Sequence, residues 1–529
     1  MRPTNMKHAF LKTRLLLAVM AAVVSLAATA HAATPGITGP TFKLTAQTAY
    51  LTQPDGQSIY SWGYGCNGAP AGFAPAAITN GTCGPMQVPG PTLIVTEGQT
   101  VTVTLTNNLP TAAGNTSILF PGFQVATTGG VAGLMTQEAA PAGTVTYTFT
   151  AASPGTHSYY SGTQGDLQIE MGLYGAVIVL PLPASVPASC NSGLAASNLT
   201  AESFWGEKDF RLASSAYDHA KSCYDREYLF QFSEIDPNIH SQALAQVTAK
   251  TGCVAGAVGC SLEVPTEPYH PAYFMINGRS MPDDMDPNYA TEYPHQPYNG
   301  NPHMHPGEQV LLRIIGQGRW QHPFHEHANH VRILARDGNL ILSQTDATQL
   351  AGPALFTTTT TPGMTMDGIF YYTGRGLNWD MYGHNPASSD ASAKLSCTPD
   401  GNGYNTGAPT AINYYEWCQD HNKPLQAAPF GDVAAGGPVT LPDPNILTNG
   451  AWYGGSPYLG PDATVRANGP TGVTPPSGTI ANSPSGEAGF AFMWHSHNER
   501  EITTNNAFPG GMMMMMLIDS REFVIDESN

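Results

Sequence analysis

Two short segments of this chain concentrate histidine at spacings that suit metal binding. In each of them, HPFHEHANH and WHSHNERE, a pair of histidines is separated by one residue. Side chains two positions apart on a strand share one face, so each pair presents two imidazoles to the same side. Imidazole is a ligand that suits copper, zinc, iron and nickel. The two segments therefore predict a transition-metal site formed by His325, His327, His495 and His497.

Three other features of the sequence have competing interpretations. His303 and His305 have the same spacing but lie in a Pro/Gly-rich approach to a strand, so we expect them at the surface. The methionine run at 512–516 could offer thioethers to Cu(I), although the filling of an apolar strand explains it more simply. Glu499 and Glu501 could ligate a metal or only solvate a loop.

The composition favours an all-β protein that would position these side chains on strands. The chain has 529 residues, of which 56 are Gly and 44 are Pro, and only 11% are charged. This balance is typical of a turn-rich folded protein and argues against long helices. Runs of β-branched and aromatic residues between Gly/Pro turns predict strands of sandwiches or barrels. The predicted strands are 92–96, 101–106, 144–150, 175–180, 228–232, 273–276, 309–315, 331–335, 367–372, 489–494 and 512–518. The first two flank a turn at Gly98 and are predicted to pair as a hairpin.

Turn-rich stretches divide the chain into predicted domains. Residues 1–32 combine basic residues, an apolar run and the small-residue site Ala30-His31-Ala32, which indicates a secretory signal peptide cleaved after Ala32. A first sandwich is expected over 33–184, and a second over 200–529 with a Gly/Pro-rich insertion at about 376–487. No later stretch has the roughly 20 apolar residues that cross a membrane, so we expect a periplasmic or secreted protein.

Charge and cysteine usage agree with an exported protein. The formal net charge of −18 argues against nucleic acid or an anionic membrane as the partner. The eight cysteines fall in sequence-local pairs, and an even count suits an oxidising compartment. We expect four disulfides: Cys66–Cys83, Cys190–Cys223, Cys253–Cys260 and Cys397–Cys418. A thiolate metal ligand is the less favoured alternative, because no Cys lies in a His-rich segment.

Five segments carry a recognisable pattern: GPTLIVTEGQTVTVTLTNNLP at 90–110, QIEMGLYGAVIV at 168–179, YFMINGR at 273–279, HPFHEH at 322–327, and the final WHSH followed by GGM. In these segments the sequence resembles the multicopper oxidases, a family of linked cupredoxin domains. The resemblance implies tandem Greek-key cupredoxin sandwiches. It also implies copper, because in that family a type 1 copper passes electrons from substrate to a three-copper cluster that reduces dioxygen to water. Eight histidines in four His-x-His pairs hold that cluster.

The resemblance assigns some ligand positions and leaves others without a ligand. The positions that match are His325 and His327 in the third pair, His495 and His497 in the fourth, and His322 as a type 1 ligand. The positions that depart are Leu119 and Pro121 in the first pair, Tyr160 and Gly162 in the second, Ser496 at the type 1 Cys and Glu501 at the second type 1 His. A serine hydroxyl cannot replace a thiolate in soft copper coordination, so neither blue copper nor laccase-like four-copper turnover is expected.

Two functions from different classes follow from this pattern. The first is an exported protein with a single His-held, non-blue copper and oxidoreductase activity on a small molecule or metal ion. A second metal position, with ligands His322, Ser496 and Glu501, is a further hypothesis on the opposite strand face. The alternative function is a copper-free cupredoxin scaffold that binds a partner in the cell envelope. Two-domain members of the family assemble as trimers, so the resemblance also predicts a homotrimer.

Overall fold

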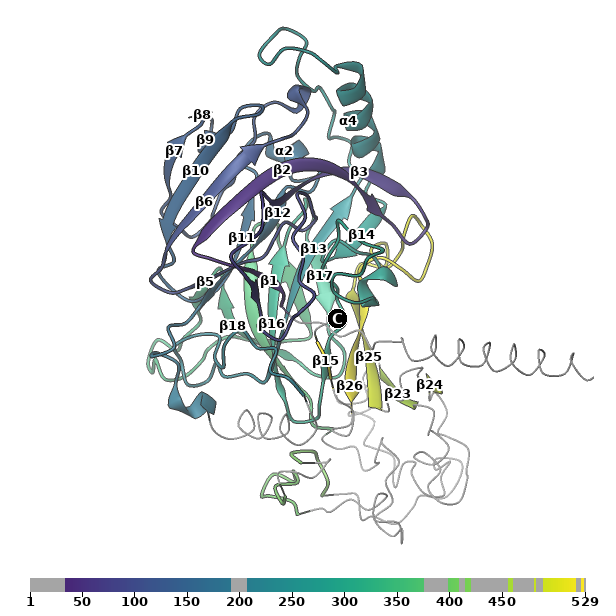
Figure 1. Cartoon of the computed structure of the whole chain (residues 1–529). Coiled ribbons are helices and arrows are strands. Elements are labelled where there is room, and N and C mark those ends of the chain that lie inside the picture. The colour runs from purple at the N-terminus through teal and green to yellow at the C-terminus, as the bar shows by residue number, and fades with distance from the viewer. Residues whose placement is uncertain are drawn as a thin grey trace, which may run out of the picture.

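The computed structural model describes residues 34–191, 207–374, 398–408, 414–419, 455–459, 480–481, 489–519 and 525–527. The predicted signal peptide and most of the predicted insertion at 376–487 lie outside these residues. The described chain is mostly β, in four large sheets with few helices, which confirms the predicted fold class. The sheets are curled, as Figure 1 shows, and they enclose two main hydrophobic cores. The predicted domain boundaries stay a prediction.

Residues 36–180 form two five-stranded sheets, the first sheet pair. One sheet has the order β11-β12-β5-β1-β4 and the other β3-β2-β6-β10-β7. Their bounds are β1 Gly36–Thr38, β2 Thr41–Thr52, β3 Ser58–Cys66, β4 Phe73–Ala74, β5 Leu93–Thr96, β6 Thr100–Asn107, β7 Ala126–Gly129, β10 Thr144–Thr150, β11 Gly155–Tyr160 and β12 Tyr174–Leu180. A small ribbon of β8 Val131–Ala132 and β9 Gln137–Glu138 lies beside them. Alternation along β6 buries Val101, Val103 and Leu105 between the sheets.

The predicted hairpin at Gly98 is wrong, although both of its strands form. β5 lies between β1 and β12 in one sheet, whereas β6 lies between β2 and β10 in the other. The backbone N–H of Glu97 donates to Leu180 O at 2.8 Å and that of Gly98 donates to Ala151 O at 2.7 Å. The turn is therefore bound to other parts of the first sheet pair, and the chain crosses from one sheet to the other instead of folding back.

Residues 226–519 form two seven-stranded sheets, the second sheet pair. One has the order β14-β13-β16-β22-β18-β19 with β20 on β18. The other has the order β15-β26-β25-β17-β21, with β23 on β25 and β24 on β23. Their bounds are β13 Arg226–Ile235, β14 Tyr273–Ile276, β15 His303–Met304, β16 Gln309–Gly316, β17 His322–His325, β18 Val331–Arg336, β19 Asn339–Leu340, β20 Ala354–Leu355, β21 Thr357–Thr360, β22 Thr365–Tyr371, β23 Gly455–Leu459, β24 Ile480–Ala481, β25 Gly489–Ser496 and β26 Met513–Asp519. Met512, Met514 and Met516 are fully buried in this core, which confirms that the methionine run fills a strand.

Few helices accompany the sheets in the described chain. They are η1 Thr111–Ala113, α2 Gly165–Gln168, η2 Ala188–Asn191, α4 Pro237–Ala249 and η3 Asp283–Met285. α4 is the longest, at 13 residues, and the sequence analysis did not predict it. Asp236 caps its first turn and Pro237 occupies its first position, both of which favour a helix start. Ile239 and Ala243 of α4 pack into the core of the first sheet pair, and α4 lies alongside β3 (Figure 1).

The expectation that His303 and His305 lie at the surface is wrong. β15 pairs with β26 inside the second sheet pair, and both imidazoles are buried. The Nδ1 of His303 lies 2.6 Å from Asp519 Oδ2, and the Nε2 of His305 lies 2.7 Å from Glu207 Oε1. Each ring is therefore paired with a buried carboxylate, which a Pro/Gly-rich local sequence does not reveal.

Three of the four predicted disulfides are confirmed: Cys66–Cys83, Cys190–Cys223 and Cys253–Cys260. Cys418 is disulfide-bonded as well, and its predicted partner Cys397 lies outside the described residues. Disulfides of this kind persist in oxidising compartments. Within the described ranges, none of the helices is both long and apolar enough to span a membrane.

Buried polar contacts join the two sheet pairs. The hydroxyl of Thr156 in β11 donates to Asp367 Oδ1 in β22 at 2.6 Å, and Arg313 Nη1 in β16 donates to the same hydroxyl at 3.1 Å. The hydroxyl of Tyr174 in β12 donates to Ser233 Oγ in β13 at 2.8 Å. The strands that carry the histidine segments are thus fixed to the first sheet pair through the neighbouring sheet.

Candidate metal centre

Strands β17 and β25 bring the two histidine segments together. They are antiparallel neighbours, with Phe324 opposite Ser496 and His325 opposite His495. The backbone N–H of His497 donates to Pro323 O at 2.8 Å, so the contact continues past the end of β25. Segments 170 residues apart in the sequence therefore lie side by side in one sheet.

His325, His327, His495 and His497 gather their rings on one side of this strand pair, and we refer to them as the four-His face. The centroid separations are 5.0 Å for His325–His327, 5.7 Å for His325–His495, 4.9 Å for His325–His497, 5.1 Å for His327–His495 and 5.7 Å for His495–His497. Across the two segments, His327 Nε2 lies 3.3 Å from His495 Nε2. The four predicted imidazoles thus lie close together, with His325 and His327 buried and His497 exposed.

Two of these rings have their Nδ1 atoms hydrogen-bonded to the protein. His325 Nδ1 lies 2.8 Å from Thr357 Oγ1. His495 Nδ1 lies 2.8 Å from the carbonyl oxygen of Ser496, and because a carbonyl oxygen can only accept a hydrogen bond, His495 Nδ1 is the donor. Burial, together with the neighbouring imidazoles, lowers the pKa of His325 to about 4, and burial also lowers the pKa of His495. Both rings are therefore neutral near pH 7, and His495 keeps its lone pair on Nε2.

The four-His face fits a transition metal by ligand type and by the spacing of His327 and His495. Metal-bound histidines commonly donate their other ring N–H to a carbonyl or similar acceptor, as His495 does. Two nitrogens that share a tetrahedral metal at about 2.0–2.1 Å lie roughly 3.3 Å apart, which is the His327–His495 separation. No set of three or more His, Cys, Asp or Glu side chains in the described ranges already converges on one metal position. A metal held by this pair would need a third ligand, and the exposed His497, whose ring centroid lies 4.9 Å from that of His325, is on the same face.

The opposite face of the same strands holds a different arrangement around His322. Its Nδ1 lies 2.9 Å from Glu501 Oε2, and its Nε2 lies 2.9 Å from Glu234 Oε2. The hydroxyl of Ser496 donates to the same Glu501 Oε2 at 2.5 Å. All four side chains are fully buried or nearly so. Burial alone would lower the pKa of His322, but the hydrogen bonds to Glu234 and Glu501 outweigh it and raise the pKa to about 9.

This second set does not fit a metal ion. Ligands about 2.0–2.2 Å from one metal lie more than 3 Å from one another, whereas Glu501 Oε2 is in direct hydrogen-bond contact with both His322 and Ser496. An imidazole that faces carboxylates on both nitrogens is a double donor and has no lone pair for a metal. Among the six predicted ligands, the structure therefore separates the four-His face from His322 and Glu501.

The sequence analysis missed Glu234, which completes the contacts of His322. Glu234 lies in β13, whose ten residues are all buried, and its segment YLFQFSEI is otherwise mostly apolar. A carboxylate inside such a strand needs hydrogen-bond or charged partners. An acidic residue in an otherwise apolar strand was therefore the signal that could have pointed to Glu234. Glu499, in contrast, is exposed, as expected for a residue that only solvates a loop.

The positions that the resemblance aligns with the first two histidine pairs are packed without metal ligands. Leu119 and Tyr160 face each other in an isolated bridge, and the side chain of Leu119 fills the space beside Gly162. The hydroxyl of Tyr160 lies against Gly363 of the second sheet pair. Pro121 lines a pocket of about 480 Å³ between the two sheet pairs.

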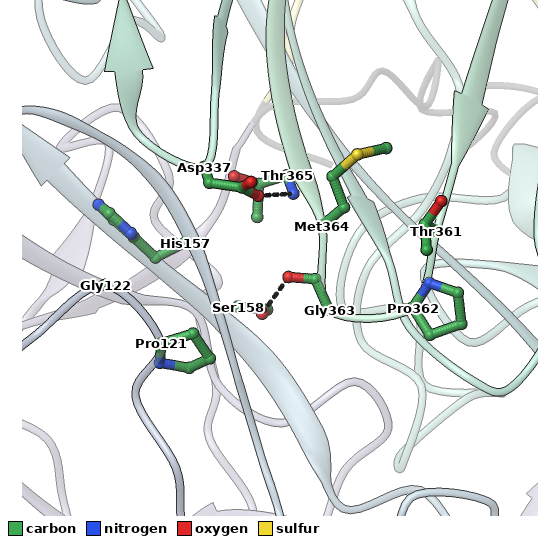
Figure 2. A pocket seen from close by; sticks show the side chains of 10 residues that line it. All are labelled: Pro121, Gly122, His157, Ser158, Asp337, Thr361, Pro362, Gly363, Met364 and Thr365. Carbon is green, nitrogen blue, oxygen red and sulfur yellow. Dashed lines mark hydrogen bonds between the residues drawn. The ribbon is translucent and has the colours of Figure 1, made fainter.

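Figure 2 shows this pocket, which lies apart from the predicted ligands. Besides Pro121 it is lined by Gly122, His157, Ser158, Asp337, Thr361, Pro362, Gly363, Met364 and Thr365. The Ser158 hydroxyl donates to Gly363 O at 3.4 Å, and the Thr365 N–H donates to Asp337 Oδ1 at 2.9 Å. None of the six predicted metal residues is among its lining residues, so the pocket is not part of the four-His face.

Comparison with known proteins places the first sheet pair in a family. Residues 77–183 match the family described as "Multicopper oxidase". The chain is thus similar to the multicopper oxidases in its first sheet pair. A laccase of Aspergillus fumigatus, "Laccase abr2", is 36% identical over 100 residues, which cover 18% of this chain and 16% of the laccase. The chain therefore aligns with only about a sixth of that curated relative.

Solved copper proteins resemble larger parts of the chain at lower identity. "Multicopper Oxidase mgLAC" and the blue copper oxidase of Nitrosomonas europaea each share 15% identity, with 90% of this chain and 85% of theirs covered, at a TM-score of 0.42. The copper nitrite reductase of Nitrosomonas europaea shares 19% identity over 63% of this chain and 85% of its own, at a TM-score of 0.38. The similarity to the multicopper oxidases is carried by the match at residues 77–183 and by the motifs of the two histidine segments.

Proposed function

We propose that this multicopper oxidase relative is an exported oxidoreductase that binds a single, non-blue copper at the four-His face. The observation that supports the proposal is the orientation of His495, whose Nδ1 donates to Ser496 O while its Nε2 lies 3.3 Å from His327 Nε2. A scaffold has no chemical need for two imidazoles that face each other in this way. Copper, when bound, would supply one-electron exchange between its two common oxidation states.

The protein residues would hold and orient that ion. Thr357 and the Ser496 carbonyl fix the rings of His325 and His495, respectively. His327 and His495 supply a close donor pair, and His497, with an exposed side chain, lies on the solvent side. A small molecule or a metal ion could reach the centre from that side, so we propose one of these as the substrate class.

Copper content and EPR of the purified protein test this proposal. After loading with Cu(II) and desalting, we expect one copper per chain with a non-blue spectrum. His327→Ala and His495→Ala should lose it, because they remove this donor pair. His330→Ala is a matched control, since His330 lies in the same segment but stacks on Phe356 with a centroid separation of 3.7 Å. Copper content near zero in the wild-type protein would refute the proposal.

A copper-free scaffold is the second candidate, and one observation favours it. Where the resemblance places the first two histidine pairs, the chain has Leu119, Pro121, Tyr160 and Gly162, which pack at or near the junction of the sheet pairs. If the wild-type protein binds no copper, this candidate becomes the better explanation and a protein partner becomes the object of the search.

We also propose that the chain is periplasmic or secreted and that it is cleaved after Ala32. The three disulfides support an oxidising compartment. The mass of the protein recovered from the exported fraction tests the cleavage. A mass that includes residues 1–32 would contradict it.

A further inference from the structure

His322 lies in a network of hydrogen bonds with Glu234, Glu501 and Ser496, and binding of a metal does not explain this arrangement. We infer that Glu234, Glu501 and Ser496 hold His322 in a closed, metal-free hydrogen-bond network that positions strand β25, and with it His495 and His497. That the network is metal-free does not depend on the proposed function. That it positions copper ligands rests on the proposed function.

The Glu501 carboxylate closes one side of this network. Its Oε2 accepts from His322 Nδ1 at 2.9 Å and from the Ser496 hydroxyl at 2.5 Å, so an oxygen atom occupies the space between the other two side chains. Its Oε1 accepts from Asn498 Nδ2 at 2.9 Å. Both oxygens of this fully buried carboxylate are therefore engaged by protein donors.

The Glu234 carboxylate closes the other side. Its Oε2 accepts from His322 Nε2 at 2.9 Å. Its Oε1 accepts from the backbone N–H groups of Arg319 and Trp320 at 2.7 and 2.9 Å, and from the Tyr269 hydroxyl at 3.1 Å. Tyr269 also lies 2.7 Å from Glu170 Oε2 of the first sheet pair. His322 is thus held between two carboxylates that are each fixed from several directions.

The network reaches the four-His face through Ser496. Ser496 lies between His495 and His497 in the sequence, and strand alternation places its side chain on the opposite face from theirs. Its hydroxyl is fixed by Glu501, and the Asn498 N–H donates to the same hydroxyl at 3.2 Å. Fixing Ser496 and the turn after it therefore fixes the backbone from which His495 and His497 project.

The first experiment asks whether the network can hold a metal. In a variant with all four histidines of the four-His face changed to Ala, equilibrium dialysis against Cu(II) and, separately, Zn(II) should show no binding above buffer. If this variant fails to fold, the double variant His327→Ala/His495→Ala replaces it. One equivalent of metal that is lost on adding His322→Ala would overturn the inference.

The second experiment asks whether the network positions the copper ligands. Glu501→Gln replaces a carboxylate, which accepts hydrogen bonds from His322 and Ser496, by an amide whose NH2 group is itself a donor. Removing the outer contacts of a metal site commonly weakens affinity by about 10–100-fold, which is the weakening we expect for copper, with an altered copper hyperfine splitting in EPR. Glu227→Gln is the matched control: Glu227 is a buried carboxylate of β13 that accepts from Arg313 Nε at 2.9 Å and Tyr224 at 2.8 Å. It should lower Tm without either copper effect.

A copper-free measurement separates this inference from the proposed function. Backbone hydrogen exchange over residues 489–501 should be faster in Glu501→Gln and in Ser496→Ala than in the wild-type protein, and unchanged in Glu227→Gln. Ser496→Ala serves if Glu501→Gln fails to fold. Absence of copper from the wild-type protein would refute the proposed function alone. Exchange and copper affinity that are the same in Glu501→Gln, Ser496→Ala and Glu227→Gln would overturn the inference.

Discussion

His322 and His325 lie three residues apart on one strand and have opposite protonation states at neutral pH. Both are buried, and burial disfavours the charged form of each. His322 faces two carboxylates that outweigh burial, whereas His325 faces other imidazoles that add to it. Alternation along β17 places the two rings on opposite faces of the strand, and the neighbours on each face decide the charge.

These opposite shifts predict a stability maximum near pH 6.5 from the two histidines in the metal-free protein. The pKa of His322 is raised from 6.5 to about 9. Its contribution to the free energy of unfolding is therefore full below pH 6.5 and is lost as the pH rises through 9. The pKa of His325 is lowered from 6.5 to about 4, so the unfolded chain takes up the proton first and stability is lost as pH falls from 6.5 to 4. Urea unfolding between pH 4 and pH 10 measures both effects.

Single substitutions test which histidine causes the loss of stability on each side of the pH maximum. His322→Gln should flatten the alkaline side and leave the acid side, and His325→Gln should do the reverse. Both proteins are treated with a chelator beforehand, because bound metal would change the protonation of the four-His face. A His322→Gln profile that still falls by the wild-type amount between pH 6.5 and 9 would contradict the assignment.

At the scale of elements, strand positions were predictable from the sequence, whereas partners were not. The runs at 144–150 and 273–276 form β10 and β14 with the predicted bounds, because alternation and β-branched residues are local signals. Which sheet a strand joins depends on contacts with residues far away in the chain. For this reason the prediction of a hairpin at Gly98 was wrong. The four-His face followed from spacing alone, whereas Glu234 is 88 residues from His322 and no spacing rule connects them.

The missed helix α4 gives a prediction about its cap. Asp236 Oδ1 accepts from Asn238 N at 2.9 Å, and its Oδ2 accepts from His270 N at 2.7 Å. Asp236→Ala leaves both of these donors without an acceptor and should lower the free energy of unfolding by about 2 kcal/mol. Ser241→Ala is the control on the same helix, since its hydroxyl donates to Pro237 O at an exposed site and should cost less than about 0.5 kcal/mol. Equal losses in urea unfolding would show that the cap is not what stabilises α4.

At the scale of the whole molecule, the oligomeric state is a prediction that comes from the family resemblance alone. A homotrimer should give the mass of three chains of 56.0 kDa, less the cleaved signal peptide, in light scattering at micromolar concentration. The trimer should persist in the metal-free protein if contacts between the subunits stabilise it. It should depend on copper if metal sites are shared between subunits. A monomer mass with and without copper would contradict the prediction.

The two sheet pairs are coupled through Thr156, and that coupling predicts how the whole chain unfolds. Its hydroxyl connects Asp367 and Arg313 of the second sheet pair at 2.6 and 3.1 Å, and hydrogen bonds to charged groups contribute about 1.5–3 kcal/mol. Thr156→Val keeps the shape and removes the hydroxyl, so we expect a loss of about 2 kcal/mol.

If the hydroxyl couples the sheet pairs, Thr156→Val should also reduce the cooperativity of unfolding, seen as a smaller dependence of free energy on urea. Thr104→Val is the matched control, because the Thr104 hydroxyl lies 3.0 Å from that of Thr146 within the first sheet pair alone. It should leave the urea dependence unchanged. An unchanged dependence in Thr156→Val as well would mean that apolar packing, such as that of α4 against the first core, carries the coupling between the two halves of the molecule.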